Sequence, residues 1–363
     1  MTTRRQFIKT AGASSLAMLA ARNTGGQTPA QIPGAPRDFG PNALPTTYPD
    51  PDVLTIDPAF GALRLGNTPI KRLWTGALWA EGPAWSVQGR YLVWSDIPNN
   101  RQLRWLEDDD RVTVFRAPSN NSNGNTFDFQ GRQLSCEHLT RRVVRYEHDG
   151  SVTTLAESIN GKRLNSPNDI APHPDGSYWF TDPPYGRSLY EGRPEPRELP
   201  TAVYRIDKSG TIAQVIGEDQ VPDPNGLAFS PDYKTLYVAS TGRGPGDAGP
   251  GGKGDVFAAD IGDGRASNVR RFSDFMIDGV KCSPDGIRCD TTGHVWCSSN
   301  AGSSVGYSGV TVWTPQARLI GRIRLPEACA NLCFGGSKRN RLFMAASQSI
   351  YAVYVNTTGA SPG

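Results

Sequence analysis

Histidine and paired cysteine motifs are scarce in this sequence. Only four of the 363 residues are histidines, and none of the six cysteines stands in a Cys-x-x-Cys pair. A zinc site built from thiolates and imidazoles is therefore not indicated. Long apolar runs are absent too, because the stretch from Thr10 to Ala21 is short and rich in alanine, serine and glycine. This excludes a stable membrane span in that stretch.

The cysteines allow two interpretations. Cys289 and Cys297 fall on strands that we expect to be adjacent, so they are the candidate disulfide to test. The alternative is that all the cysteines are buried free thiols that pack as small apolar residues. The six positions are Cys136, Cys282, Cys289, Cys297, Cys329 and Cys333.

Positive charge is concentrated at the N-terminus. Residues 1–30 hold four basic residues and no acid, so the net charge falls from +3 to −1 without them. Arg4-Arg5 followed by small and apolar residues resembles a twin-arginine signal peptide, cleaved after Ala21 or Ala30; the alternative is an amphipathic surface helix. The sequence thus predicts export by the Tat machinery to the periplasm or beyond, and the charge gives no indication of a nucleic-acid partner.

Three further segments follow the predicted signal. Residues 31–69 are rich in proline and without periodicity, which is typical of a linker or an arm laid over a domain. Residues 70–355 are assigned to a single domain, and residues 356–363 to a tail.

An internal repeat organises that domain. The stretch from Pro224 to Asp232 places a polar residue and a glycine before a short apolar strand, then a turn, and a second strand follows. Six copies begin 42 to 60 residues apart, which is the range of four-stranded propeller blades. The fold class predicted is therefore all-β, a six-bladed β-propeller.

The last copy is incomplete. It supplies strands at 331–334, 341–345 and 349–355 and then the domain ends. The segment Ile70–Trp74, ahead of the first copy, is predicted to provide the missing strand, so that the ring closes without an exposed edge.

The repeat also predicts a site, because the innermost strand of each blade lines the axis of a propeller. Two carboxylates and four amides occupy the repeated position, a hard oxygen-rich set that suits calcium better than zinc. One divalent cation is expected, calcium first, with zinc, magnesium and manganese as the alternatives. The alternative is that these side chains cap turns, although glutamate is a poor turn former. The six residues are Glu81, Asn123, Asn168, Asn225, Asp285 and Asn331.

Several of these segments together resemble the SMP-30/gluconolactonase/LRE-like (senescence-marker-protein) family. They include Glu81–Trp85, Ser166–Asp169, Phe180–Gly186, Asp223–Asp232 and Pro284–Ile287. Members of that family are six-bladed propellers that bind a divalent cation on the axis and hydrolyse sugar lactones.

The resemblance implies roles for particular residues. Glu81, Asn225 and Asp285 would be metal ligands, Asn168 would contact metal or substrate, and Asp285 would also be the catalytic acid or base. Animal members carry a substrate-binding arginine where this chain has Ser166, so their sugar specificity cannot be carried over.

The expected function is therefore hydrolysis of a small-molecule sugar lactone to the aldonic acid. A bound cation polarises the carbonyl and water attacks, so no covalent nucleophile is needed. Asn123 and His138 are further candidates for substrate binding. The alternatives are an organophosphate or aryl-ester hydrolase on the same scaffold, and a noncatalytic ligand-binding propeller.

Overall fold

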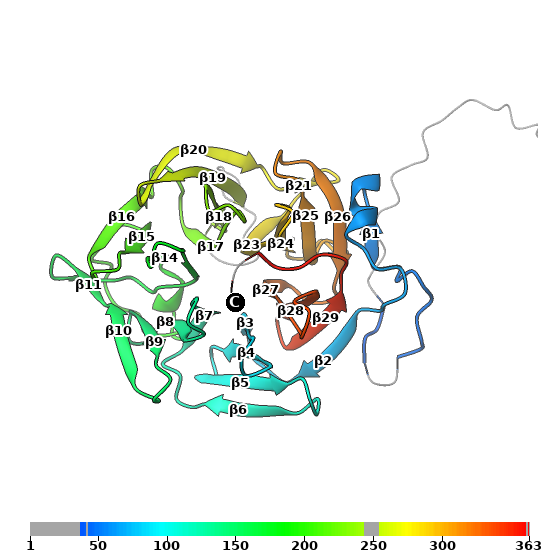
Figure 1. Ribbon diagram of the computed structural model, residues 1–363, viewed down its shortest axis with the longest axis horizontal. Coiled ribbons are helices and arrows are strands. Elements are labelled where there is room, and N and C mark those ends of the chain that lie inside the picture. Colours follow the sequence, from blue (N-terminus) through cyan, green and yellow to red (C-terminus); the bar gives the residue numbers. More distant parts are fainter. Residues whose placement is uncertain (1–36, 41–42, 243–253, 361, 363) are drawn as a thin grey trace, which may run out of the picture. The chain divides into compact units, whose positions relative to one another are not determined.

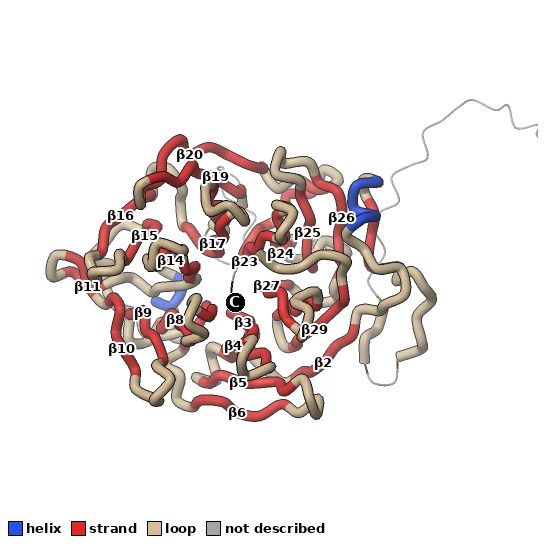
Figure 2. Tube along the Cα trace, in the orientation of Figure 1, coloured by secondary structure: helices blue, strands red, loops and turns tan. Residues whose placement is uncertain are grey.

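The repeated segments fold into antiparallel sheets that surround a common axis as six blades (Figure 1). The computed structural model describes residues 37–40, 43–242, 254–360 and 362. Almost all regular structure in this part of the chain is β, with two short 3-10 helices (Figure 2). The six-bladed propeller is thus confirmed.

Each of the first three blades is a four-stranded meander, numbered here from the axis outward. Blade one has β3 (Ala80–Ser86), β4 (Tyr91–Asp96), β5 (Arg101–Leu106) and β6 (Val112–Arg116). Blade two has β7 (Ser122–Phe127), β8 (Gln133–Glu137), β9 (Arg142–Tyr146) and β10 (Val152–Ala156). Blade three has β13 (Ile170–Pro172), β14 (Tyr178–Thr181), β15 (Ala202–Ile206) and β16 (Ile212–Gly217).

The other blades follow the same order, and blade five carries an extra outer strand. Blade four has β17 (Pro224–Phe229), β18 (Thr235–Ser240), β19 (Asp255–Gly262) and β20 (Arg265–Ser273). Blade five has β23 (Ser283–Cys289), β24 (Val295–Asn300), β25 (Gly309–Trp313), β26 (Leu319–Arg324) and β1 (Val53–Thr55). Blade six has β27 (Cys329–Gly335), β28 (Arg341–Ala346), β29 (Ser349–Tyr354) and β2 (Lys71–Thr75).

Two small hairpins join blades. One is formed by β11 (Ser158–Ile159) and β12 (Lys162–Arg163), the other by β21 (Met276–Ile277) and β22 (Val280–Lys281).

Large side chains pack the blades against one another. The ring of Trp85 in blade one stacks on Phe343 of blade six, with centroids 5.6 Å apart, and Trp296 meets Phe334 edge-on at 5.4 Å. These side chains are at most 2% exposed. Aromatic pairs of this kind add to the stabilisation from their buried area.

The closure of the ring is confirmed. Strand β2 pairs with β29 in antiparallel register, with Lys71 opposite Ala352 and Thr75 opposite Ser349. A segment that precedes blade one thereby provides the outer strand of blade six. The edge of β29 is covered, which removes a site for pairing with another chain.

The segment assigned to a linker or arm contributes structure that sequence patterns did not reveal. Val53–Thr55 adds β1 to the edge of β26, and the 3-10 helix η1 (Pro58–Ala62) follows. Phe60 of this helix is 1% exposed and lies 6.2 Å from the ring of Trp296. The arm is therefore bound to the outside of blade five.

Asp50 holds the arm in place. Its buried carboxylate accepts two hydrogen bonds of 2.6 Å from Arg37 and one of 2.8 Å from the amide of Ile70. Asp50→Ala removes these three hydrogen bonds and leaves Arg37 with Asp52, at 2.7 Å, as its remaining acidic partner. We expect the free energy of unfolding in urea to fall by about 2–3 kcal/mol.

The control for this prediction is Asp109→Ala. The Asp109 side chain is 47% exposed, so its replacement should change stability by less than about 0.5 kcal/mol. A loss below about 1 kcal/mol for Asp50→Ala would mean that the arm does not stabilise the propeller.

The cysteines are free. All six are buried, and Cys289 lies opposite Val295 while Cys297 lies opposite Ile287. The two candidates for a disulfide therefore do not face each other across the β23–β24 pair. The interpretation as buried apolar thiols is the one that holds.

Two sequence features lie outside the described residues. They are the predicted signal at residues 1–30 and most of the glycine-rich stretch at residues 243–253. Within the part of the chain that the structure does describe, no helix has the length and apolarity needed to cross a bilayer.

Candidate functional site

The repeated polar position lies at the start of the innermost strand in every blade. All six side chains are buried, with exposed fractions of only 2–3%. Figure 1 shows these inner strands gathered around the axis. The set consists of Glu81, Asn123, Asn168, Asn225, Asp285 and Asn331.

Glycines next to this position bring neighbouring blades into direct contact. A methyl group added at Gly82 would lie 2.1 Å from the carbonyl oxygen of Asn123, and one added at Gly226 would lie 2.1 Å from the carbonyl oxygen of Asp285. A real Cβ atom cannot lie so close to a carbonyl oxygen, so only glycine fits at these two positions. The glycine of the repeat therefore sets the spacing between the inner strands.

Gly226→Ala tests this spacing. The new methyl group must displace the backbone at Asp285, so we expect a loss of about 1–3 kcal/mol in the free energy of unfolding, together with a fall in activity. Gly262→Ala is the matched control, because Gly262 also lies in blade four and a methyl group there meets nothing within 4 Å. Equal effects of the two substitutions would refute the argument.

Glu81 and Asn331 are linked across the boundary between blades one and six. The Asn331 side-chain amide donates to Glu81 Oε2 at 3.1 Å, and Glu81 Oε2 also accepts the amide of Gly82 at 2.5 Å. Asn331 Oδ1 accepts the amide of Leu332, so that oxygen is turned toward the backbone. Asn331 orients Glu81 and does not offer its own oxygen to the axis, contrary to the idea that all six residues do.

Asp285 is the least compensated group in the ring. Both of its carboxylate oxygens are buried without a hydrogen-bond partner, and so is Asn123 Oδ1. Burial, and then the charge of Glu81, raise the pKa of Asp285 well above its usual range. Burial and then the charge of Asp169 raise the pKa of Glu81 to about 8, against the lowering effect of its hydrogen bonds.

A buried oxygen cluster of this kind fits a hard cation. Unpartnered carboxylate oxygens are costly in a protein interior, and a metal ion would satisfy them. No group of three or more histidine, cysteine, aspartate or glutamate side chains suited to a metal occurs among the described residues. The fit therefore depends on amide oxygens beside two carboxylates, a donor set for calcium or magnesium more than for zinc.

Residues 183–200, here called the cap loop, bring two further groups to the ring. The 3-10 helix η2 (Tyr185–Arg187) begins this loop, and Glu191 lies close enough to raise the pKa of Asp285 and Glu81. Burial raises the pKa of Glu191 itself to about 7. The cap loop thus adds a third carboxylate near the site.

His138 lies beneath the cap loop. Its Nδ1 is 3.2 Å from the carbonyl oxygen of Glu191 and 3.9 Å from the Glu191 carboxylate, and its Nε2 is buried without a partner. Burial lowers the pKa of His138 to about 4, so the ring is neutral near pH 7. With the Nδ1 proton donated to the carbonyl, Nε2 is a free acceptor.

Ser166 has a structural role that its sequence position did not indicate. Its hydroxyl donates to the carbonyl of Pro183 at 2.5 Å and accepts the amide of Gly186 at 3.1 Å. Gly186 in turn lies against the His138 ring, because a methyl group added there would be 2.3 Å from it. Ser166 therefore anchors the cap loop.

Three charged residues near the ring were missed in the sequence. Asp169 directly follows a repeated residue, and Arg288 lies three positions after another, one residue beyond the segment Pro284–Ile287. Neither carried a repeat signal. Glu191 stands in the long insertion between β14 and β15, outside the repeated segments. Nothing in the repeat could have indicated it.

One motif with the spacing of a serine nucleophile occurs in blade five. Gly302, Ser304 and Gly306 fit Gly-x-Ser-x-Gly, but they lie in a turn between β24 and β25. A nucleophile elbow joins a strand to a helix, and here the next element is a strand. The motif does not support a serine hydrolase.

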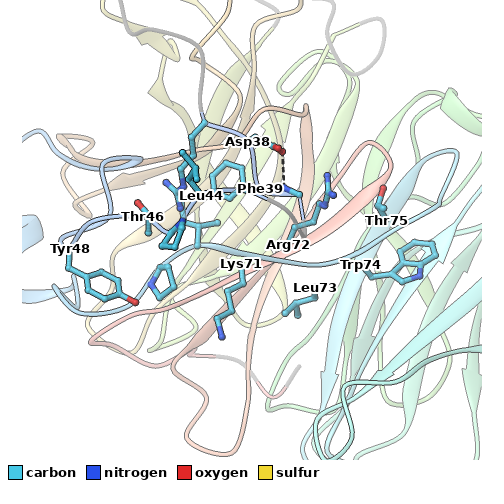
Figure 3. A pocket seen from close by; sticks show the side chains of 16 residues that line it. Asp38, Phe39, Leu44, Thr46, Tyr48, Lys71, Arg72, Leu73, Trp74 and Thr75 are labelled. Carbon is cyan, nitrogen blue, oxygen red and sulfur yellow. Dashed lines mark hydrogen bonds between the residues drawn. The ribbon is translucent and has the colours of Figure 1, made fainter.

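A groove of about 610 Å³ lies on the outside of the molecule. Figure 3 shows Leu44 and Tyr48 of the arm on one side and Lys71 and Trp74 of β2 on the other. It is the seam between the arm and blade six, and it contains none of the six axial residues. Its lining therefore gives no support for hydrolytic chemistry.

Comparison with known proteins agrees with the ring geometry. The family model described as SMP-30/Gluconolactonase/LRE-like region matches residues 79–348. This chain belongs to that family. The matched range extends from β3 to β28, so it includes every inner strand.

Relatives within the family include enzymes with named activities. A gluconolactonase of Zymomonas mobilis is 28% identical over 326 residues, which is 85% of this chain and 87% of that protein. A solved gluconolactonase from Xanthomonas campestris is 34% identical, with a TM-score of 0.74, and covers 89% of this chain and all of the other. A regucalcin from Agrobacterium tumefaciens, at 19% identity and a TM-score of 0.63, shares the fold.

Proposed function

We propose that this protein hydrolyses a sugar lactone to the aldonic acid with the help of one divalent cation, calcium in the first instance. The observation that carries the proposal is Asp285, whose two buried oxygens have no partner inside a ring of oxygen donors. The gluconolactonases among its relatives support the substrate class.

Glu81, Asn225 and Asp285 would hold the cation, with Asn168 beside them. When bound, the cation supplies Lewis-acid polarisation of the ring ester carbonyl. Asn331 keeps the Glu81 carboxylate turned toward the site through its 3.1 Å hydrogen bond.

The remaining groups handle the substrate and the proton. Asn123 Oδ1 and His138 Nε2 are buried acceptors without partners, so each can receive a hydrogen bond from a sugar hydroxyl. Asp285 would accept a proton from the attacking water, and the ring oxygen would leave as a hydroxyl after receiving a proton. The cap loop limits the access of bulk water.

A lactone panel with metal add-back tests this function. Turnover of gluconolactone, corrected for spontaneous ring opening, should disappear in chelator and return with calcium, while Asp109→Asn behaves as wild type. Magnesium, manganese and zinc are compared under the same conditions, and paraoxon serves as the competing ester. Metal-independent turnover, or preference for paraoxon, would overturn the proposal.

We also propose that residues 1–30 direct export by the Tat machinery to the periplasm or beyond. The support is the Arg4-Arg5 pair ahead of a weakly apolar stretch. Replacing both arginines by lysine should retain the protein in the cytoplasm of a Tat-competent bacterium, as seen by cell fractionation. Lys9→Arg is the control, and unchanged export of the double variant would contradict the prediction.

A further inference from the structure

A buried ion pair, Arg288–Asp169, joins the innermost strand of blade five to the start of the innermost strand of blade three. Arg288 of β23 is 7% exposed, and its guanidinium donates to Asp169 Oδ2 at 3.2 Å and to the carbonyl of Ile287 at 2.6 Å. A cavity of about 20 Å³ adjoins it, which is room for a single water. The guanidinium is therefore largely shielded from bulk solvent, which screens its charge only weakly.

Asp169 connects this pair to the acidic ring. It directly follows Asn168, and its Oδ1 accepts the amide of Ile170 at 2.9 Å. A methyl group added at Gly124 would lie 2.9 Å from the same oxygen, so the carboxylate is held at the blade boundary. Its charge acts on both Glu81 and Asp285.

The summed charge of the ion pair and the two axial carboxylates matches the charge of a divalent cation. When all three are ionised, as cation binding would require, Glu81, Asp169 and Asp285 carry three negative charges, and Arg288 supplies one positive charge. Among the ion pairs of the described residues, Arg288–Asp169 is the only one that involves any of the three acids. Within this set of four groups two positive charges are missing, which is what a divalent cation provides. Glu191 is a further carboxylate on the cap loop, with its side chain 20% exposed, and is not counted in this set.

We propose that Arg288 is a positioning residue that acts as an internal counter-charge and matches the axial site to a divalent ion. This inference rests on the metal in the proposed function. Arg288 itself touches neither the metal nor the substrate. It acts through Asp169, and its removal makes the site more negative without removing a ligand.

Metal affinities of charge variants test the proposal. Arg288→Met should bind calcium about tenfold more tightly and terbium about thirtyfold more tightly in calorimetry, because Coulomb energy scales with the charge of the ion. The terbium-to-calcium ratio thus rises about threefold. Asp169→Asn should lower both affinities and the ratio, and the double variant should return to wild type.

The controls separate a charge effect from a packing effect. Arg288→Lys keeps the charge and should keep the wild-type ratio, whereas loss of packing alone would change both affinities equally. If Arg288→Met does not fold, the affinities of Asp169→Asn and of the double variant still test the charge effect. A terbium-to-calcium affinity ratio that is unchanged in the charge variants would overturn this inference alone. A wild-type protein that binds neither ion would overturn the proposed metal and, with it, this inference.

Discussion

Asp285→Asn is expected to abolish lactone hydrolysis and, at the same time, to make the metal-free protein more stable. The two effects have one cause, which is a buried carboxylate with no partner of its own. Turnover should fall about 1,000-fold, equivalent to about 4 kcal/mol of transition-state stabilisation. In chelator near pH 8, the free energy of unfolding should rise by about 1–3 kcal/mol, because a desolvated charge has been removed.

The matched control is another buried aspartate of the same blade. Asp290 is fully buried, but its carboxylate accepts hydrogen bonds from the Trp296 indole, the Thr292 hydroxyl and the His294 amide. These bonds outweigh burial, so the pKa of Asp290 is lowered. Asp290→Asn should therefore destabilise the protein, opposite to Asp285→Asn, and thermal melts in chelator measure both. A destabilised Asp285→Asn would show that the carboxylate serves the fold and not a cation.

The fold could be predicted because the repeat carries it. Each copy contains a strand and a turn, and four of the six have a glycine after the polar residue. The missing strand of blade six left a gap that Ile70–Trp74 could fill. The strand β1 could not be found in this way. Val53–Thr55 lies in a proline-rich segment. Its pairing with β26 occurs only in blade five, so no repeated sequence pattern could indicate it.

The site could be predicted only as far as its residues follow the repeat. Glu81 and Asp285 were identified from their equivalent positions, because the propeller geometry brings such positions to the axis. The orientation of Asn331 could not be predicted. An asparagine whose side chain turns to the backbone of Leu332 looks the same in the sequence as one that faces the axis. Arg288 and Glu191 needed coordinates, because their roles come from which groups they meet.

The metal-free protein is expected to lose stability as the pH rises from about 4.5 to 8. Glu81 titrates near pH 8 in the folded state, against an ordinary value of 4.5. Between these values the folded state holds more protons than the unfolded state, so the free energy of unfolding falls with pH. Glu191, with a pKa of about 7, acts in the same direction.

Calcium bound at the proposed site should oppose this loss of stability at high pH. The cation needs deprotonated ligands, so the rise in melting temperature that it produces should be larger at pH 8 than at pH 5. Melts across this range, with calcium or with chelator, measure the effect, and Glu81→Gln should flatten the chelator curve.

Asp182 gives the internal reference for that experiment. Burial raises the pKa of Asp182 to about 7, but its carboxylate accepts the amides of Asn165 and Ser166, both at 2.8 Å. Its part of the pH dependence should therefore remain when calcium is present. If calcium stabilised the protein equally at both pH values, the ion would be bound by groups other than the buried carboxylates of the ring, and the assignment of Glu81 and Asp285 as ligands would fail.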